Sequence, residues 1–367
     1  MMRRDVQRCL DAPCGSALAG VITRGMSMHD ALWHVACAVL LLGATGCDAR
    51  AAPSANGTQP LSAFVAVTFN AGTPDCSRSP DAAYSCDDAA IAADWYGTGL
   101  AFKLLVDEAR SFFSGLQPDV VAFQEIFYSG DCPDIPTRFH PGFVCEDWQP
   151  GAPTVVQLVL GPDYQIACNI GKPDKCLAVK KTFGRWRGCA SELCLDHLAG
   201  ARVTGCGSGS RIGRGVIDLV GGDEITIINV HGTAGITNAD QDCRVRQFEQ
   251  VFADLGDGSA APAANGMRNL VLGDLNVDPA RMFWDASATT WNRYVGDGLP
   301  FHFLTEVGFT AEPTYAGLFN IDHVASDAFT GTCTSDEPTD IVAFDHLPIV
   351  CNLSLPSLGS GSWGPRT

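Results

Sequence analysis

The chain has 367 residues, of which 46% are hydrophobic and 18% charged, and its formal net charge is −17. This composition is typical of a globular protein and excludes a disordered one. So acidic a chain gains nothing from long-range attraction to nucleic acid, which argues against tight, nonspecific DNA binding as its task. A nuclease with a local basic loop or a bound metal ion stays open. The length allows one large domain or two ordinary ones.

The first 47 residues have the features of an export segment. The apolar run 31–43 is too short to span a bilayer and has the length of a signal-peptide core. It is followed by Ala-Thr-Gly-Cys at 44–47, which resembles the lipobox of bacterial lipoproteins. In such proteins the cysteine, here Cys47, is lipidated and becomes the mature N-terminus. An ordinary signal peptide cleaved near Ala49 or Ala52 is the alternative.

These features predict a secreted or periplasmic, cell-envelope protein with a candidate lipid anchor at Cys47. That anchor would be its one link to a membrane. The true start is open, because Met26 and Met28 are plausible starts as well. Residues 48–60 are rich in Ala, Pro, Ser and Gly and are expected to form a flexible tether.

The cysteines predict disulfide bonds. The chain has 16, of which three lie in the export segment and Cys47 is the lipidation candidate. An even set of twelve remains, which indicates an oxidising compartment. Pairing of sequence neighbours is favoured because it closes short loops; a zinc cluster is the rival, although no CxxC pair has a suitable companion. The expected pairs are 76–86, 132–145, 168–176, 189–194, 206–243 and 333–351.

The folded domain is expected to cover 61–356, with a Gly/Ser-rich tail at 357–367. Its elements follow from short apolar runs, which indicate strands, and from helical periodicity. Residues 184–211 are the least regular part, and we find no internal repeat. Strands are predicted at 64–69, 118–125, within 164–183, at 216–220, 224–230, 269–276, 303–309, 320–325, 341–343 and 347–355. Helices are predicted within 88–116 and at 153–160, 239–255 and 279–292.

The strand at 269–276 ends in Asp274 and Asn276, which lie two residues apart and so point to the same face. A carboxylate beside an amide suits a metal-bound phosphate, although such a pair alone is also ordinary turn chemistry. Other strands end in similar groups, and sheet folds gather active sites at strand ends. These groups are Asn70, Gln124-Glu125, His231, Asp322-His323 and Asp345-His346.

In this order the motifs resemble the endonuclease/exonuclease/phosphatase superfamily. Its members include deoxyribonuclease I, apurinic endonucleases, neutral sphingomyelinases and inositol polyphosphate 5-phosphatases. The resemblance implies a deoxyribonuclease I-like, four-layered α/β sandwich, in which two mainly antiparallel sheets pack face to face with helices outside. The matching stretches are TFN at 68–70, PDVVAFQE at 118–125, INVH at 228–231, GDLN at 273–276, NIDHV at 320–324 and FDHLPIV at 344–350.

The resemblance also implies a metal site. Glu125 matches the metal-binding Glu of the family and Asn70 the Asn beside it, while Asp345 is a further candidate ligand. Mg²⁺ is the expected ion, with Mn²⁺ and Ca²⁺ as alternatives. It would neutralise charge on a phosphodiester and polarise its P–O bond.

The catalytic roles are implied in the same way. Asp274 matches the Asp that orients the attacking water, and Asn276 the Asn that holds the phosphate. Asp322 matches the Asp that hydrogen-bonds the catalytic His, here His346. His231 matches the His that contacts the scissile phosphate or protonates the leaving oxygen, but the sequence offers no carboxylate partner for it.

The sequence departs from the family's pattern at His323 and in the missing carboxylate partner of His231. His323 stands where the family often has Tyr or another hydrophobic residue, and a structural role is favoured over that of a spare ligand. A basic loop that includes Arg185, Trp186 and Arg187 and is closed by Cys189 and Cys194 is the candidate substrate contact; a solvated loop with Trp186 packed inward is the alternative.

The expected function is therefore a metal-dependent phosphodiesterase. Its partner would be a phosphoester substrate, with nucleic acid favoured, and no obligate protein partner is evident. A sphingomyelinase-like phospholipase C is the second hypothesis, although the sequence shows no clear apolar hairpin that would enter a membrane. A non-catalytic binding lipoprotein on the same fold is the third.

Overall fold

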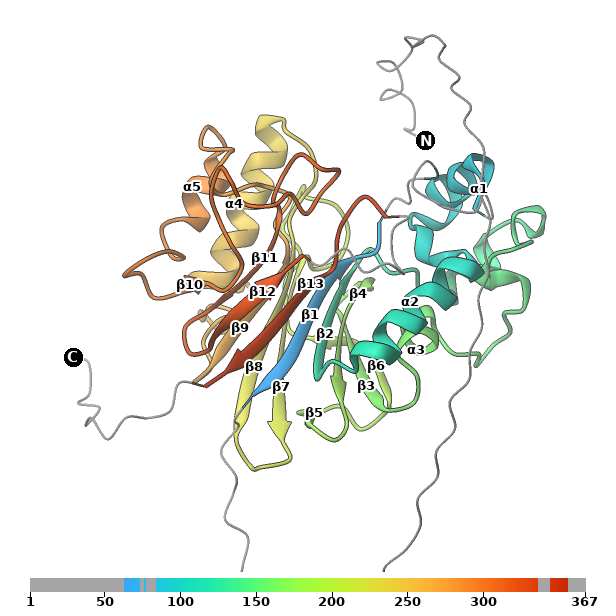
Figure 1. Ribbon diagram of the computed structural model, residues 1–367, viewed down its shortest axis with the longest axis horizontal. Coiled ribbons are helices and arrows are strands. Elements are labelled where there is room, and N and C mark those ends of the chain that lie inside the picture. The colour runs from blue at the N-terminus through green and yellow to red at the C-terminus, as the bar shows by residue number, and fades with distance from the viewer. Residues whose placement is uncertain (1–62, 73–75, 77–83, 336–343, 356–367) are drawn as a thin grey trace, which may run out of the picture. The chain divides into compact units, whose positions relative to one another are not determined.

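The computed structural model describes residues 63–72, 76, 84–335 and 344–355 (Figure 1). The expected export segment with Cys47, the tether, the tail and the predicted strand at 341–343 lie outside this part. Within the described residues, no helix combines the length and the apolar character that crossing a bilayer requires.

One sheet has seven strands in the order β12-β13-β1-β2-β4-β3-β6. The neighbours β1 and β2 run parallel, as do β3 and β6, and the other pairs are antiparallel. The strands are β1 (Phe64–Asn70), β2 (Val120–Gln124), β3 (Tyr164–Asn169), β4 (Lys172–Lys180), β6 (Leu193–Leu198), β12 (Thr330–Thr334) and β13 (Ile349–Ser354).

The second sheet has six strands in the order β10-β11-β9-β8-β7-β5. Here β8 and β9 run parallel, and the other pairs are antiparallel. The strands are β5 (Gly184–Trp186), β7 (Ile212–Leu219), β8 (Glu224–His231), β9 (Asn269–Asp274), β10 (His302–Phe303) and β11 (Asp322–Ser326).

Helices cover the outer face of each sheet, whereas the inner faces meet each other (Figure 1). Inward-facing residues of both sheets, such as Leu177 and Ile227, form a shared core. The seven-stranded sheet packs its other face against α1, α2 and α3, and the six-stranded sheet packs against α4 and α5. The α-helices are α1 (Cys86–Ile91), α2 (Lys103–Leu116), α3 (Val155–Leu160), α4 (Asn238–Phe252) and α5 (Ala286–Trp291), and the short 3₁₀ or π turns are η2 (Ala92–Tyr96), η3 (Gly99–Ala101), η4 (Ser129–Asp134), η5 (Thr137–Phe139) and η6 (Val144–Glu146).

The structure therefore has the layers helix, sheet, sheet, helix, and the predicted four-layered sandwich is confirmed. The helical patterns explain why the helices lie where they do. In α2, Leu105, Val106, Ala109 and Phe113 recur at helical spacing and are buried against the sheet. In α4, Thr237 caps the first turn in a reciprocal capping box.

Several boundaries differ from the sequence expectation. The hairpin strand predicted at 216–220 already begins at Ile212, and the helix predicted at 279–292 is only α5, which starts after Asp285 caps it. The segment 184–211, expected to be irregular, contributes β5 and β6, and β12 was not predicted at all. These strands are short or exposed edge strands, and edge strands carry little hydrophobic pattern.

All six predicted disulfide pairs are present. Each joins cysteines that are neighbours in sequence, and the separations run from 5 to 37 residues. Two of them, Cys168–Cys176 and Cys333–Cys351, bridge residues directly opposite each other on adjacent antiparallel strands. The six bonds are Cys76–Cys86, Cys132–Cys145, Cys168–Cys176, Cys189–Cys194, Cys206–Cys243 and Cys333–Cys351.

Candidate active site

The strand directions bring the predicted site residues to one end of both sheets. Parallel strands β1 and β2 end in register at Asn70 and Gln124, and β8 and β9 end in register at His231 and Asp274. Strand β11 runs the other way, so its first residue, Asp322, stands opposite Asp274. Strand β13 also runs the other way, and His346 precedes it.

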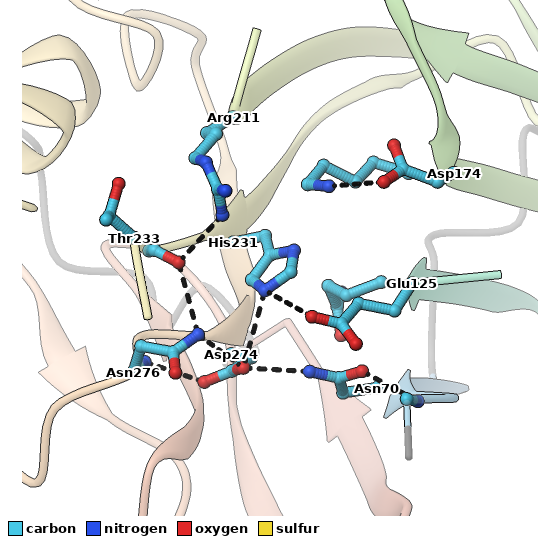
Figure 2. Close-up of polar contacts among 12 residues, drawn as sticks. Asn70, Glu125, Asp174, Arg211, His231, Thr233, Asp274 and Asn276 are labelled. Carbon is cyan, nitrogen blue, oxygen red and sulfur yellow. Dashed lines mark hydrogen bonds and ion pairs between the residues drawn. The ribbon is translucent and has the colours of Figure 1, made fainter. Parts of the chain in front are cut away.

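Asp274 lies at the centre of this cluster and is completely buried. Its Oδ2 accepts hydrogen bonds from Asn70 Nδ2 at 2.8 Å and Asn276 Nδ2 at 2.7 Å, and its Oδ1 accepts one from the Asn276 amide at 2.6 Å (Figure 2). The preceding Gly273 has φ 145°, and a Cβ there would stand 1.9 Å from the Val230 carbonyl oxygen. Only glycine therefore lets β9 approach β8 so closely beside the carboxylate.

The imidazole of His346 is held by the carboxylate of Asp322, which a threonine hydroxyl holds in turn. Asp322 Oδ2 lies 2.8 Å from His346 Nδ1 and accepts a hydrogen bond from Thr314 Oγ1 at 2.8 Å. The His346 Nε2 faces Asp274 Oδ2 at 3.9 Å. The Tyr315 ring packs beside the imidazole, with 4.7 Å between ring centroids. The ring of His346 is thus fixed in orientation with Nε2 turned toward the centre of the site.

The second imidazole stands between two carboxylates. His231 Nε2 is 3.3 Å from Glu125 Oε1 and 3.7 Å from Asp274 Oδ2 (Figure 2). Glu125 adopts a left-handed backbone conformation with φ 57°, which is rare for this residue type and clusters at functional sites. The carboxylate partner that the sequence did not offer for His231 is therefore Glu125, together with Asp274. It could not be read from sequence because β2 and β8 belong to different sheets.

The two imidazoles differ in charge. Burial and the nearby charge of Lys175 lower the pKa of His231 to about 4, so it is neutral at pH 7. Burial also acts to lower the pKa of His346, but the carboxylates of Asp322 and Asp274 outweigh it and raise that pKa to about 10. His346 is therefore an imidazolium at neutral pH.

The carboxylates differ as well. Burial opposes the charged form of Glu125, but its contact with His231 and the charge of Lys175 outweigh burial and lower the pKa to about 2. Burial raises the pKa of Asp274 to about 7, although the charge of His346 opposes the shift. A carboxylate with such a pKa can exchange a proton near neutrality.

The oxygen atoms around Glu125 fit a hard divalent cation. A Cβ added at Gly72 would stand 2.6 Å from Glu125 Oε2 and 3.1 Å from Asn70 Oδ1, so the absence of a side chain leaves space between these oxygens. Asp345 Oδ1 is buried without a hydrogen-bond partner. Burial raises the pKa of Asp345 to about 6, and the charge of Glu125 contributes in the same direction. Glu125, Asp345 and Asn70 are thus the side chains that could hold a divalent cation, although Asn70 Oδ1 also accepts a hydrogen bond from the Gly72 amide at 3.0 Å.

A second group with metal-ligand geometry lies within the cluster. One candidate ligand atom from each of Asp274, Asp322 and His346 lies within 4.8 Å of the others. In this group the His346 Nδ1 already bonds Asp322, and both oxygens of Asp274 accept amide hydrogen bonds. These bonds leave fewer free ligand atoms in this group than at Glu125 and Asp345.

The hydrogen bonds of Asn276 and His323 bear on the roles that the sequence suggested for them. Both N–H groups of the Asn276 side chain are used, one by Asp274 Oδ2 and one by the Gly232 carbonyl at 3.1 Å. In this structure Asn276 positions Asp274, and no amide hydrogen is free for a phosphate. His323 is buried and lies within hydrogen-bond distance of the Thr305 hydroxyl and the Asn320 carbonyl, which fits the structural role that was favoured for it.

The predicted substrate contact at 185–187 is wrong for Trp186, whereas a role for the half-exposed Arg185 and Arg187 stays a prediction. Trp186 is only 2% exposed, packs in the core between the sheets and donates its Nε1–H to the Gln165 carbonyl at 3.0 Å. It stands opposite Ile217 in β7, whereas Ile212 at the other end of β7 pairs with Val230 beside His231. The basic segment is therefore at the opposite end of the sheet from the cluster. The inward-packed alternative for Trp186 is the observed one.

Neighbours that sequence reasoning missed include Thr314 and Asn229. Asn229 is buried between the sheets, where its Oδ1 accepts a hydrogen bond at 2.8 Å from the Nε2 of Gln124, the residue before Glu125. Thr314 lies in a loop without periodic pattern, so no signal in the sequence points to it. Asn229 carried a weak signal, since it lies between the apolar residues Ile228 and Val230 in the stretch INVH at 228–231.

Solved structures similar to this chain include three that are described as endonuclease/exonuclease/phosphatase proteins. The endonuclease/exonuclease/phosphatase from Bacteroides vulgatus is 12% identical, with TM-score 0.46, and the match covers 80% of this chain and 99% of that one. The catalytic domain of human Nocturnin with bound sulfate is 12% identical, with TM-score 0.45, over 80% and 94% of the two chains. Beta toxin from Staphylococcus aureus is 13% identical, with TM-score 0.44, over 78% and 99%.

No protein-family model and no curated protein matches the sequence. The values for the solved structures describe a remote likeness, so the function has to be argued from the site itself.

Proposed function

We propose that the protein is a metal-dependent phosphodiesterase that hydrolyses a phosphoester by in-line attack of an activated water, with nucleic acid as the favoured substrate. The observation that carries the proposal is Asp274, buried between a neutral and a charged imidazole and beside an oxygen-lined space. Mg²⁺ held by Glu125, Asp345 and Asn70 would supply charge neutralisation and polarise the P–O bond.

Asp274 is suited to take the proton of the attacking water. Amide donors occupy three of the roughly four lone-pair positions of its carboxylate, which leaves room for one more donor. Asn70 and Asn276 hold it in one orientation. Its pKa of about 7 lets it accept a proton during turnover and release it afterwards.

The two histidines divide the remaining work. His346 is held as an imidazolium by Asp322, so its Nε2–H can stabilise the negative charge that develops on a phosphoryl oxygen. His231 is neutral and buried against Glu125, which favours a role in holding that carboxylate toward the metal over a role as general acid.

We further infer that the protein acts outside the cytoplasm, because six disulfides are rarely kept in a reducing compartment. Lipidation of Cys47 stays a prediction from the sequence.

The direct test offers plasmid DNA, RNA and sphingomyelin to the purified, oxidised protein with Mg²⁺. We expect cleavage of DNA or RNA that EDTA lowers by about a hundredfold or more and that added Mg²⁺ restores, because a catalytic metal supplies several kcal/mol of charge stabilisation. Full activity after exhaustive chelation would contradict the metal, and no turnover on any substrate would contradict the proposal.

One observation favours the second hypothesis, a sphingomyelinase-like phospholipase C, enough for it to be tested beside the first. Phe283, Trp284 and Phe309 are 63–73% exposed and lie on the connections between β9 and β11, the strands that carry Asp274 and Asp322. Arg281 ties these connections together by donating to the Phe309 carbonyl at 3.2 Å. Exposed aromatic groups of this kind suit a membrane interface. Cleavage of sphingomyelin alone in the same assay would favour this hypothesis over the nuclease.

A further inference from the structure

A cavity of about 440 Å³ adjoins the catalytic cluster on the side away from Asp274. Glu125 and His231 form its inner wall, and β4 and the segment before β7 form its outer wall. Figure 2 shows Arg211 and Asp174 there, across His231 from Asp274. Its volume falls within the range of small-molecule sites.

Three cations line this cavity. Lys175 is only 1% exposed, and its Nζ lies 3.0 Å from Asp174 Oδ2; Lys172 Nζ lies 3.4 Å from the same oxygen. The disulfide between Cys168 and Cys176 joins β3 to β4 directly beside Lys175, which restrains this wall of the cavity. A buried lysine so close to a catalytic cluster is costly unless an anion uses its charge.

Arg211 is the third cation. Its Nη1 donates to the Gly232 carbonyl at 3.1 Å, while its Nε is buried without a hydrogen-bond partner. Among the residues that the structure describes, no carboxylate forms an ion pair with Arg211. A guanidinium with an unused buried N–H suits a planar, bidentate acceptor such as a phosphoryl group.

Three carboxylates also line the cavity, but only one of them pairs with its cations. Asp174 is shared by both lysines, and Glu125 belongs to the catalytic cluster. Asp131 is exposed, although partial burial and the charges of Asp134 and Asp174 raise the pKa of its carboxyl. With Glu125 assigned to the metal, the cavity offers two lysines and an arginine against Asp174 and the exposed Asp131, and Arg211 forms no ion pair with either.

We propose that this cavity is a subsite for a second anionic group of the substrate, a phosphoryl group next to the scissile phosphoester, bound by Arg211 and Lys175. The inference rests on the proposed phosphodiesterase function and narrows its substrate to compounds with neighbouring phosphates, such as a nucleotide chain. Arg211 binds this group and takes no part in the chemical step.

The test compares two thymidine dinucleotides that share the scissile phosphodiester, one with and one without a 5′-phosphate. We expect the protein to hydrolyse the phosphorylated dinucleotide with a kcat/KM about tenfold higher, mainly through KM, since a charge-assisted hydrogen bond contributes on this scale. Arg211→Gln should bring the ratio to within about twofold of one, and Arg211→Lys should retain part of it. Arg187→Gln, at the other end of the sheet, is the matched control and should keep the full ratio.

A binding measurement separates failure of the subsite from failure of the function. Calorimetry with inorganic phosphate on the Asp274→Asn protein should show binding that Arg211→Gln weakens about tenfold. Equal hydrolysis of both dinucleotides, or a preference for the unphosphorylated one, would overturn the subsite while the phosphodiesterase stands. If neither dinucleotide is hydrolysed, the assay with plasmid DNA, RNA and sphingomyelin decides whether the proposed function fails, and the phosphate titration alone decides whether the subsite exists.

Discussion

Strand β7 connects two regions of the sandwich that carry arginine residues in contrasting surroundings. At one end, Arg187 is half exposed and is neutralised by Asp218 at 3.0 Å and Glu224 at 2.6 Å. At the other end, Arg211 is partly buried beside His231 and has no acidic partner among the described residues. A basic stretch of sequence therefore does not by itself form an anion-binding site. Such a site also requires that the fold leave a basic side chain without an acidic partner and direct it into a cavity.

The same contrast holds for the carboxylates at the two ends. Asp218 lies on the surface and pairs with an arginine, whereas Asp274 is buried among amides and imidazoles. Surface pairs contribute little to stability, and buried groups of perturbed pKa are typical of active sites.

The largest expected effect separates these two aspartates. Asp274→Asn should lower kcat by about 10³-fold or more, because it removes the group that accepts the proton of water, within the range of general base catalysis. Asp218→Asn is the matched control and should change kcat by less than about twofold. Steady-state hydrolysis of the same phosphodiester, with circular dichroism to verify folding, measures both; equal kcat values for the two variants would remove Asp274 from the mechanism.

The next effect is one of stability. Trp186→Ala should lower the free energy of unfolding by about 3–5 kcal/mol, because it opens a cavity in the core between the sheets and leaves the Gln165 carbonyl without its donor. Denaturant unfolding of the oxidised protein measures it. If KM rose strongly while stability hardly changed, Trp186 would be a substrate contact after all.

A smaller effect is expected at Asp322. Asp322→Asn keeps an oxygen for Thr314 but removes the charge that holds His346 as an imidazolium, so kcat should fall about 10–100-fold with little change in KM. Asp327→Asn, on a carboxylate at the other end of β11 that accepts from Asn269, serves as the control and should leave kcat within about twofold. An unchanged kcat in Asp322→Asn would mean that His346 does not act through its charge.

The smallest effect is expected at Arg187. Arg187→Gln should leave kcat and KM within about twofold and lower the free energy of unfolding by no more than about 1 kcal/mol, because its two carboxylate partners are exposed. Hydrolysis kinetics and denaturant unfolding on the same preparation test the expected kinetic constants and the expected stability. A tenfold rise in KM for a nucleic acid would restore the substrate role that the sequence suggested.

The features that the sequence predicted correctly are those set by local patterns, such as strand ends and disulfides between neighbouring cysteines. The strands that end in Asn70, His231 and Asp274 were identified because a buried strand is an apolar run and its end is marked by the first polar group. The disulfides were identified because neighbouring cysteines close short loops. The four-layered arrangement followed from the resemblance and not from any single pattern.

The rest depends on strand order and register, which no local pattern contains. Residues 185–187 and Arg211 belong to one basic, Cys-rich stretch of sequence, yet β7 separates them by its full length. Glu125 and His231 meet only because two different sheets pack face to face. Thr314 reaches Asp322 from a loop whose path follows from the packing around it.

The disulfide connectivity has a consequence for how the chain matures. Among the described residues, the first cysteine bonds the second, the third bonds the fourth, and so on to the end, with no crossed or nested pair. A chain that enters an oxidising space from its N-terminal side therefore exposes each cysteine shortly before its proper mate, at most 37 residues later. Simple oxidation in order of emergence already yields the native set, so maturation should need an oxidant but little help from a disulfide isomerase.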